Sequence, residues 1–152
     1  MEKIVIAFWQ LYEALRDAHL VGEFGSGPVR RNSFRIERGV VVLPGGIRVE
    51  LSALDLTIYI LFLRHPSGIS TSDLWQHYSE LLDIYRRHSA CSDAVWMERR
   101  IDDLCDAPYA SFYSHISSIR RRISAALPPV DAHRFCIARG ADGRYRIPAL
   151  RR

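Results

Sequence analysis

SFYSHISSIRRRISAAL, residues 111 to 127, is the stretch around which this 152-residue chain is organised. Its apolar residues recur at spacings of three and four, the period of one face of an α-helix. The stretch therefore predicts a helix that buries this stripe in a core. Serines and arginines take the other face and its flanks, which suits either a DNA groove or a solvated surface helix with its basic residues placed late. The predicted buried residues are Phe112, Ile116, Ile119, Ile123 and Leu127.

The bulk composition bounds the class of protein. With 152 residues and 48% hydrophobic content, the chain can bury a core and fits one domain with an additional arm. Its three cysteines follow no regular spacing, so we expect a reducing compartment, the cytoplasm, and no disulfide framework. Residues 1 to 20 place acidic residues inside an apolar pattern without a small-residue cleavage site, so neither a signal peptide nor a membrane span is expected.

The charge is unevenly distributed along the chain, although the net charge is only +4. Residues 69 to 107 hold four basic and eight acidic residues, whereas residues 108 to 152 hold nine basic and two acidic ones. The last third is therefore strongly basic. This asymmetry predicts a surface that faces a polyanion at the C-terminal end of the chain.

Residues 1 to 33 are predicted to form an arm, and residues 34 to 152 the main domain. A helix to about residue 18 carries an apolar arc wider than one packing surface needs. It is either clamped between layers of its own domain or packed on a second copy of the chain. Glycines and a proline make residues 21 to 32 a linker. In the dimer interpretation, the interface residues are Ile4, Phe8, Trp9 and Leu15.

A small antiparallel sheet and a central helix are predicted next. Residues 34 to 37, 40 to 43 and 47 to 51 are short runs rich in β-formers, with a Pro-Gly-Gly turn before the last. Ser52, with Asp55 three residues on, predicts a capping box that opens a helix. Because that helix is apolar almost all round, we expect it in the middle of the core.

Two further helices are predicted before the basic one. Ser70 and Asp73 repeat the capping signature for a helix over residues 71 to 87, and a helix, a Pro/Gly turn and a capped helix open a helix-turn-helix unit. An acidic segment, residues 89 to 108, follows and contains a helix over residues 93 to 106. Val95, Trp96, Ile101 and Leu104 are expected to face inward, and Trp75 is expected to be a core aromatic.

The chain is predicted to end in a basic β-hairpin. Residues 134 to 139 and 144 to 147 are interpreted as strands joined by a turn. Directly after a basic helix, such a hairpin is what a DNA-binding wing would look like. An ordinary terminal hairpin with charged edges also explains the strands, but not the excess of arginine over acid.

This order of elements resembles the winged-helix effector domain of OmpR/PhoB-type response regulators. VELSALDLTIYILFLRHPSGISTSDLW, residues 49 to 75, is similar to the first two helices of that family. HISSIRRRI (115 to 123) resembles the core of its recognition helix, and FCIARGADGRYRI (135 to 147) its wing. The resemblance does not extend to a receiver domain or to the acidic segment. It implies an α+β winged helix-turn-helix fold with a small antiparallel sheet, a three-helix core and a C-terminal wing, to which the N-terminal helix is added.

The resemblance implies a bacterial transcriptional regulator that binds double-stranded DNA. The helix at 111 to 127 would enter the major groove, and the hairpin at 134 to 147 would reach the backbone or the minor groove. Serine reads bases permissively and arginine prefers guanine edges, so tolerant recognition is expected. Ser114, Ser118 and Arg121 would point at base edges. The remaining predicted DNA contacts are Ser111, His115, Arg120 and Arg122 on the helix and Arg139 and Arg144 on the wing.

A second class of function stays open, a winged-helix adaptor that binds another protein through the acidic helix at 93 to 106 or through the N-terminal helix. An acidic element lying over the basic helix would favour it, because negative charge there costs DNA affinity. No catalytic or nucleotide-binding pattern is present, so an enzyme and a cofactor are not expected. His88, Cys91 and Cys105 lack the spacing of zinc ligands, so no metal site is expected either.

Overall fold

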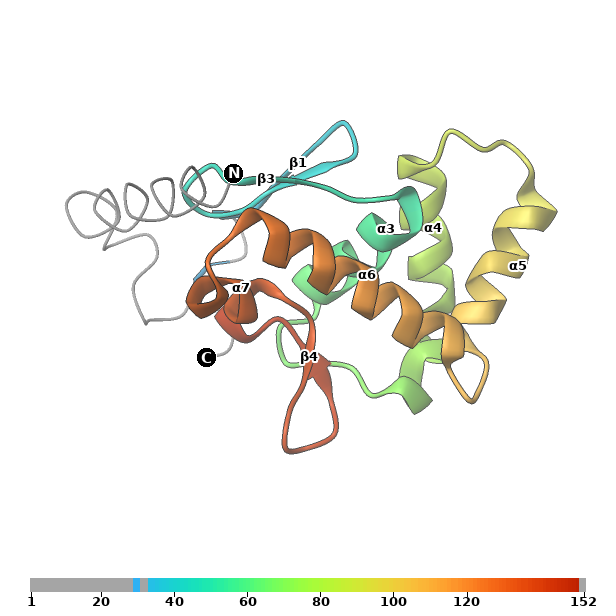
Figure 1. The fold of residues 1–152 in the computed structure, drawn as a ribbon. Coiled ribbons are helices and arrows are strands. Elements are labelled where there is room, and N and C mark those ends of the chain that lie inside the picture. The colour runs from blue at the N-terminus through green and yellow to red at the C-terminus, as the bar shows by residue number, and fades with distance from the viewer. Residues whose placement is uncertain (1–28, 31–32, 151–152) are drawn as a thin grey trace.

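The computed structural model describes residues 29–30 and 33–150 and shows an α+β protein (Figure 1). The predicted N-terminal helix, including Ile4, Phe8, Trp9 and Leu15, and most of the predicted linker lie outside the described residues. The elements are β1 (Arg35–Glu37), β2 (Val40–Val42), β3 (Arg48–Glu50), α3 (Ala53–Arg64), η3 (Thr71–His77), α4 (Tyr78–His88), α5 (Ala94–Cys105), α6 (Ala110–Ala126), α7 (Pro129–Phe135), β4 (Ala138–Arg139), β5 (Tyr145–Arg146) and η4 (Pro148–Leu150).

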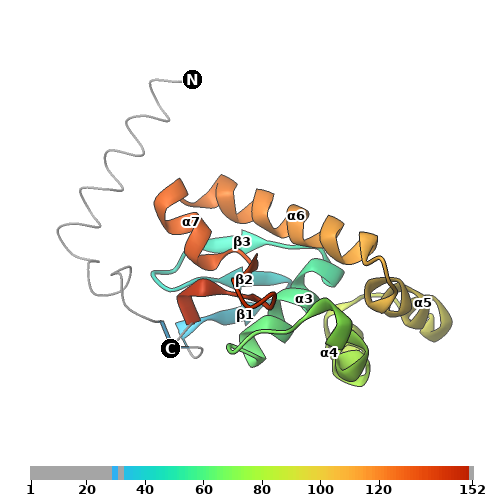
Figure 2. The same ribbon diagram turned by 90° about the horizontal axis from the view of Figure 1, so that it is seen from below.

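The predicted three-stranded meander is confirmed. Its strands pair antiparallel in the order β1-β2-β3, with Val41 opposite both Ile36 and Val49. Along β3, Val49 is buried while Arg48 and Glu50 on either side of it are exposed, which is the alternation of a strand with one covered face. Figure 2 shows β3 as the strand nearest α6, and these two elements are in contact.

Helix α3 lies at the centre of the core, as its sequence predicts. Ten of its twelve residues are buried, and it contacts both α4 and α6. The hydroxyl of Tyr59 donates a hydrogen bond of 2.8 Å to the backbone carbonyl of Phe135, a residue 76 positions later in the chain. At the start of the helix, Ser52 Oγ accepts a hydrogen bond of 3.2 Å from the backbone N–H of Asp55, so the predicted N-cap is confirmed.

The helix predicted over residues 71 to 87 has two parts, the 3₁₀ segment η3 and the α-helix α4. Ser70 makes no side-chain cap, so the predicted second capping box is wrong. Its backbone carbonyl instead accepts from Asp73 N at 3.0 Å, an i to i+3 bond that favours the tighter helix. The carboxylate of Asp73 accepts from Gln76 instead of turning back to the cap.

Helix α5 forms as predicted, but the prediction of which residues it buries is partly wrong. Its core stripe is Met97, Ile101, Leu104 and Cys105. Val95 and Trp96 are 66% and 45% exposed, because the helix packs with the side centred on Ile101. The carboxylate of Asp93 caps the helix by accepting from Trp96 N at 3.0 Å. Trp75 is also 46% exposed rather than in the core, and its ring stacks on Tyr78.

The end of the chain differs from the prediction in one element. Residues from Pro129 to Phe135 form the helix α7, so the strand predicted from residue 134 is wrong and β4 begins only at Ala138. Proline at the first helical position fits this helix, because its missing N–H is not needed there. The hairpin itself is confirmed, and it gains a further partner. Backbone hydrogen bonds of 2.9 Å in both directions join Tyr145 to Ile69, in the loop before η3.

None of the helices in the described part of the chain is long and apolar enough to cross a membrane.

Candidate nucleic-acid interface

The outer face of α6 is polar and open. Phe112, Ile119 and Ile123 are at most 1% exposed, so the stripe predicted from the sequence is the packed side of the helix. Ile116 and Leu127 are buried as well. Positions half a turn away from the stripe carry Ser114, Ser117 and Arg121, all of them exposed. Ser111, in the first turn, is half-buried.

One flank of α6 is held against α3 by Asp55, which is 3% exposed. Its Oδ1 lies 2.6 Å from Nδ1 of His115, and its Oδ2 accepts a hydrogen bond of 2.7 Å from Ser118 Oγ. The prediction that Ser118 points at base edges is therefore wrong, since its hydroxyl is turned inward. His115 uses Nδ1 for this inward contact, while its side chain stays 18% exposed. The carboxylate predicted to complete the capping box of α3 is used here instead.

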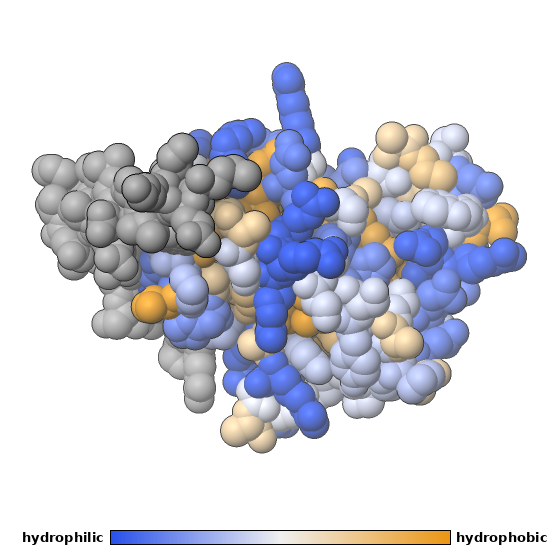
Figure 3. All heavy atoms as spheres, in the orientation of Figure 1, coloured by the Kyte–Doolittle hydropathy of each residue, from blue (hydrophilic) through white to orange (hydrophobic). Residues whose placement is uncertain are grey.

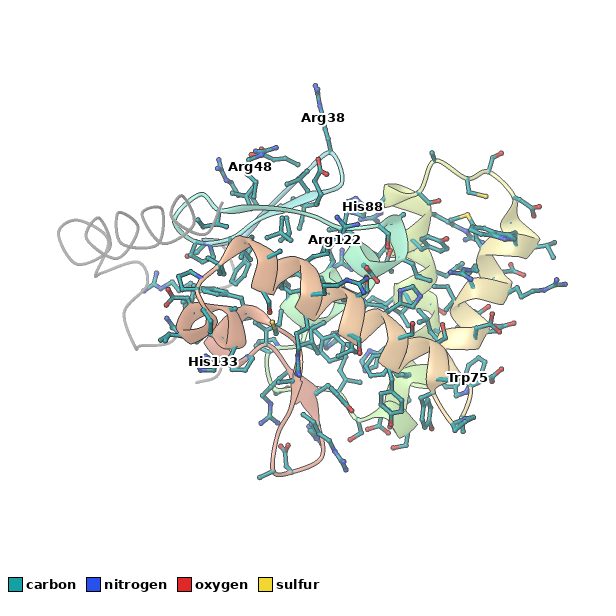
Figure 4. The ribbon with its side chains drawn as sticks, in the orientation of Figure 1. Arg38, Arg48, Trp75, His88, Arg122 and His133 are labelled. Atoms are coloured by element: carbon teal, nitrogen blue, oxygen red, sulfur yellow. The ribbon has the colours of Figure 1, made fainter. Side chains whose placement is uncertain are left out.

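The other flank of α6 faces α7 and the hairpin. Arg120, Ser124, His133 and Cys136 are among the residues that line an open pocket of about 410 Å³. Burial raises the pKa of the Cys136 thiol, an effect that the Arg120 guanidinium and a hydrogen bond with Ser124 partly offset. Arg120 and Arg122 are both exposed. Arg122 is labelled in Figure 4, where Arg38 also extends outward from the β1–β2 turn.

The hairpin presents two of its arginines to solvent and holds a third. Arg139 and Arg144 are exposed. Arg146 instead donates a hydrogen bond of 3.0 Å to the carbonyl of Ser67 and pairs with Asp142. Hydrogen bonds from Arg146 and from the backbone of Arg144 lower the pKa of Asp142. The predicted wing residues thus remain available to a ligand, whereas Arg146 fastens the hairpin to the loop before η3.

The five predicted arginines of α6 and the hairpin lack ion-pair partners among the described residues, although the carboxylate of Asp142 lies on the same hairpin and pairs with Arg146. In the part of the chain that the structure describes, no carboxylate lies within ion-pair distance of Arg120, Arg121, Arg122, Arg139 or Arg144. Five arginines earlier in the chain do have such partners, at 2.9 to 3.9 Å: Arg35, Arg48, Arg64, Arg86 and Arg87. Figure 3 shows strongly hydrophilic residues in a band across this face, from the β1–β2 turn to the hairpin.

The acidic segment does not lie over this face. Helix α5 contacts α4, η3 and α6, and Figure 2 places it beside α4 at the end of α6. Two of its carboxylates are directed at neighbours: Glu98 lies 3.9 Å from Arg86, and Asp102 is hydrogen-bonded to Tyr78. Burial and the neighbouring carboxylate of Asp102 raise the pKa of Tyr78 to about 12.

Candidate metal ligands gather at a place that the sequence pattern did not indicate. His88, Cys91 and Cys105 do not form such a group among the described residues. Within residues 29–30 and 33–150, the one group of three possible ligands is His65, His77 and Glu80. In the sequence, the only indication of this group is the i, i+3 spacing of His77 and Glu80, which places two side chains on the same side of a helix.

Comparison of the chain with protein-family models, with curated proteins and with solved structures finds no match. Any inference about function therefore depends on the geometry described above.

Proposed function

We propose that this chain is a winged-helix protein that binds double-stranded DNA, a bacterial transcriptional regulator in type. Helix α6 would lie in the major groove, and the β4–β5 hairpin would act as the wing on the backbone or the minor groove. The order of α3, α4, α6 and hairpin supports this proposal. So does the pairing of Tyr145 with Ile69, which anchors the hairpin beside the start of η3.

The observation that carries the proposal is the set of five exposed arginines without carboxylate partners among the described residues, on α6 and the hairpin. Five arginines of the earlier elements are ion-paired, whereas the exposed Arg38 and Arg99 have no carboxylate partner among the described residues either, so what sets α6 and the hairpin apart is the clustering of five such groups. Phosphate groups of DNA would supply the missing counter-charges, and the released counterions would drive binding.

The exposure of its residues is the basis on which we propose roles along α6. Ser114, Ser117 and Arg121 occupy its outermost positions and are the candidates for base edges. Arg120 and Arg122, on the two flanks, are placed for phosphates. Serine is a permissive reader of bases, so a single copy is expected to bind many sequences with similar affinity.

Fluorescence anisotropy with a mixed-sequence duplex, at about 50 and about 200 mM salt, tests the proposal. We expect a steep loss of affinity with salt, and we expect Arg121→Ala with Arg144→Ala to flatten the salt slope by about 1 to 2. The matched control is Arg86→Ala with Arg87→Ala, which removes the same charge from arginines that already have partners. Absence of binding at low salt, or an equal loss in the control, contradicts the proposal.

An adaptor that binds a protein through α5 is the second candidate. Its support is the exposure of Val95 and Trp96 on the outer side of that helix, next to acidic residues. Against it stands the position of α5, which leaves the basic face of α6 uncovered. A protein that fails to bind duplex at low salt but binds a basic peptide through Trp96 would favour the adaptor.

A further inference from the structure

Three side chains that can bind metal ions converge where α3, η3 and α4 approach one another. His65 follows the last residue of α3, His77 ends η3, and Glu80 is in the first turn of α4. Their nitrogen and oxygen atoms all lie within 4.8 Å of one another. The two histidine rings meet edge to face, with centroids 4.6 Å apart.

The distances from Glu80 to the two histidines are close to those between ligands of a tetrahedrally coordinated metal ion. Oε2 of Glu80 lies 2.9 Å from Nε2 of His65 and 3.6 Å from Nδ1 of His77. Two ligands about 2.1 Å from a tetrahedral zinc ion are roughly 3.4 Å apart, so the observed separations lie on either side of the required one. The two histidine nitrogens lie within 4.8 Å of each other, so they would have to draw together for all three atoms to surround one ion.

The chemistry of the three groups also suits a cation. Partial burial raises the pKa of Glu80, but hydrogen bonds and charges of His65 and Arg64 outweigh it and bring the pKa below its usual value. Arg64 lies 3.5 Å from Oε1 of Glu80, an oxygen that is also 3.2 Å from Nε2 of His65, and this contact orients the carboxylate. The three side chains are 21 to 32% exposed, which gives an ion access from solvent.

We propose that His65, His77 and Glu80 form a binding site for a divalent transition-metal ion of the zinc type. Two imidazoles and one carboxylate are the ligands that zinc, cobalt and nickel prefer, whereas magnesium and calcium select oxygen ligands. Three protein ligands leave the fourth position to water. The site does not depend on the proposed DNA binding.

A bound ion would join the two ends of the segment between α3 and α4. That segment contains Ile69, whose backbone pairs with Tyr145 of the hairpin. The ion would thus tie His65 to the η3–α4 junction across this loop and stiffen the support of the hairpin. Binding of the folded state alone would also stabilise the protein.

The test is titration of the metal-free, tag-free full chain with zinc chloride in a calorimeter, and with Co²⁺ followed by visible absorption. We expect one equivalent to bind with tetrahedral Co²⁺ absorption. His65→Gln and His77→Gln should each weaken binding at least roughly tenfold, the scale of loss known for groups that support a metal. His133→Gln, a histidine of α7 outside the cluster, is the matched control and should bind as the parent does.

His77→Gln is the decisive variant, because its ring lies farther from Glu80 than that of His65 and its removal disturbs the ion pair least. Circular dichroism shows whether it is folded. Absence of saturable binding by the parent overturns the proposal. So does unchanged binding by folded His77→Gln, or a Co²⁺ spectrum with the strong charge-transfer band of cysteine ligands.

Discussion

Replacing Asp55 with alanine should weaken the packing of α6 against α3. The carboxylate is 3% exposed and receives two short contacts, 2.6 Å from His115 and 2.7 Å from Ser118. A hydrogen bond to a charged group contributes about 1.5 to 3 kcal/mol. Asp55→Ala removes both contacts and leaves two half-buried polar groups without their partner. We therefore expect the free energy of unfolding to fall by about 3 to 5 kcal/mol, the loss that breaking a buried pair typically causes.

Urea denaturation followed by circular dichroism measures this loss. Ser118→Ala removes only one of the two contacts and should cost about 1 to 2 kcal/mol. Asp55→Asn keeps the shape and one oxygen acceptor, so it should fall between the other two variants. The dependence of the free energy on urea should stay unchanged, because each variant exposes the same surface on unfolding. A loss below about 1 kcal/mol for Asp55→Ala, or an equal loss for Ser118→Ala, refutes the assigned role of Asp55.

Two further predictions concern the core. Tyr59→Phe leaves the buried carbonyl of Phe135 without its 2.8 Å hydrogen bond, so we expect a loss of about 1 to 2 kcal/mol in the same assay, and a loss below about 0.5 kcal/mol contradicts it. Thiol labelling of the native protein at pH about 8 should modify Cys91 first, since it is only half-buried, whereas burial and nearby carboxylates raise the pKa of Cys105 to about 12. Mass spectrometry of the labelled peptides checks this order, and labelling of Cys105 at the rate of Cys91 contradicts it.

Local patterns in the sequence were sufficient for the framework of this fold. The spacing of Phe112, Ile119 and Ile123 predicted the packed side of α6, and the cap Ser52 predicted where α3 begins. Such signals succeed because the period of a helix and the hydrogen bonds of its first turn involve residues only a few positions apart. The placement of Arg121 on the outer face follows from the same period.

The predictions were wrong where the same residues are compatible with two different environments or two different secondary structures. Val95 and Trp96 are apolar and fit an inward face, but α5 has enough apolar residues to pack on its other side, around Ile101. The run from Arg134 resembles a strand, yet the Pro-Pro sequence before it starts a helix that continues to Phe135. In α5 the packing of neighbouring elements decided which side of the helix is buried, whereas in α7 the local helix start at Pro129 overrode a strand-like run.

By itself, the sequence determined the positions of the strands of the first sheet and of most helices, the buried stripe of α6 and the basic character of the last third. The tertiary structure alone decided which polar groups meet: Asp55 with Ser118, 63 positions later, and His65 with Glu80, 15 positions later. Periodicity states which side of a helix is polar, but the partner of a polar side chain depends on how separate elements dock. For that reason the sequence predicted a basic surface, whereas only the structure showed that Ser118 and His115 hold α6 in place while Arg121 stays free.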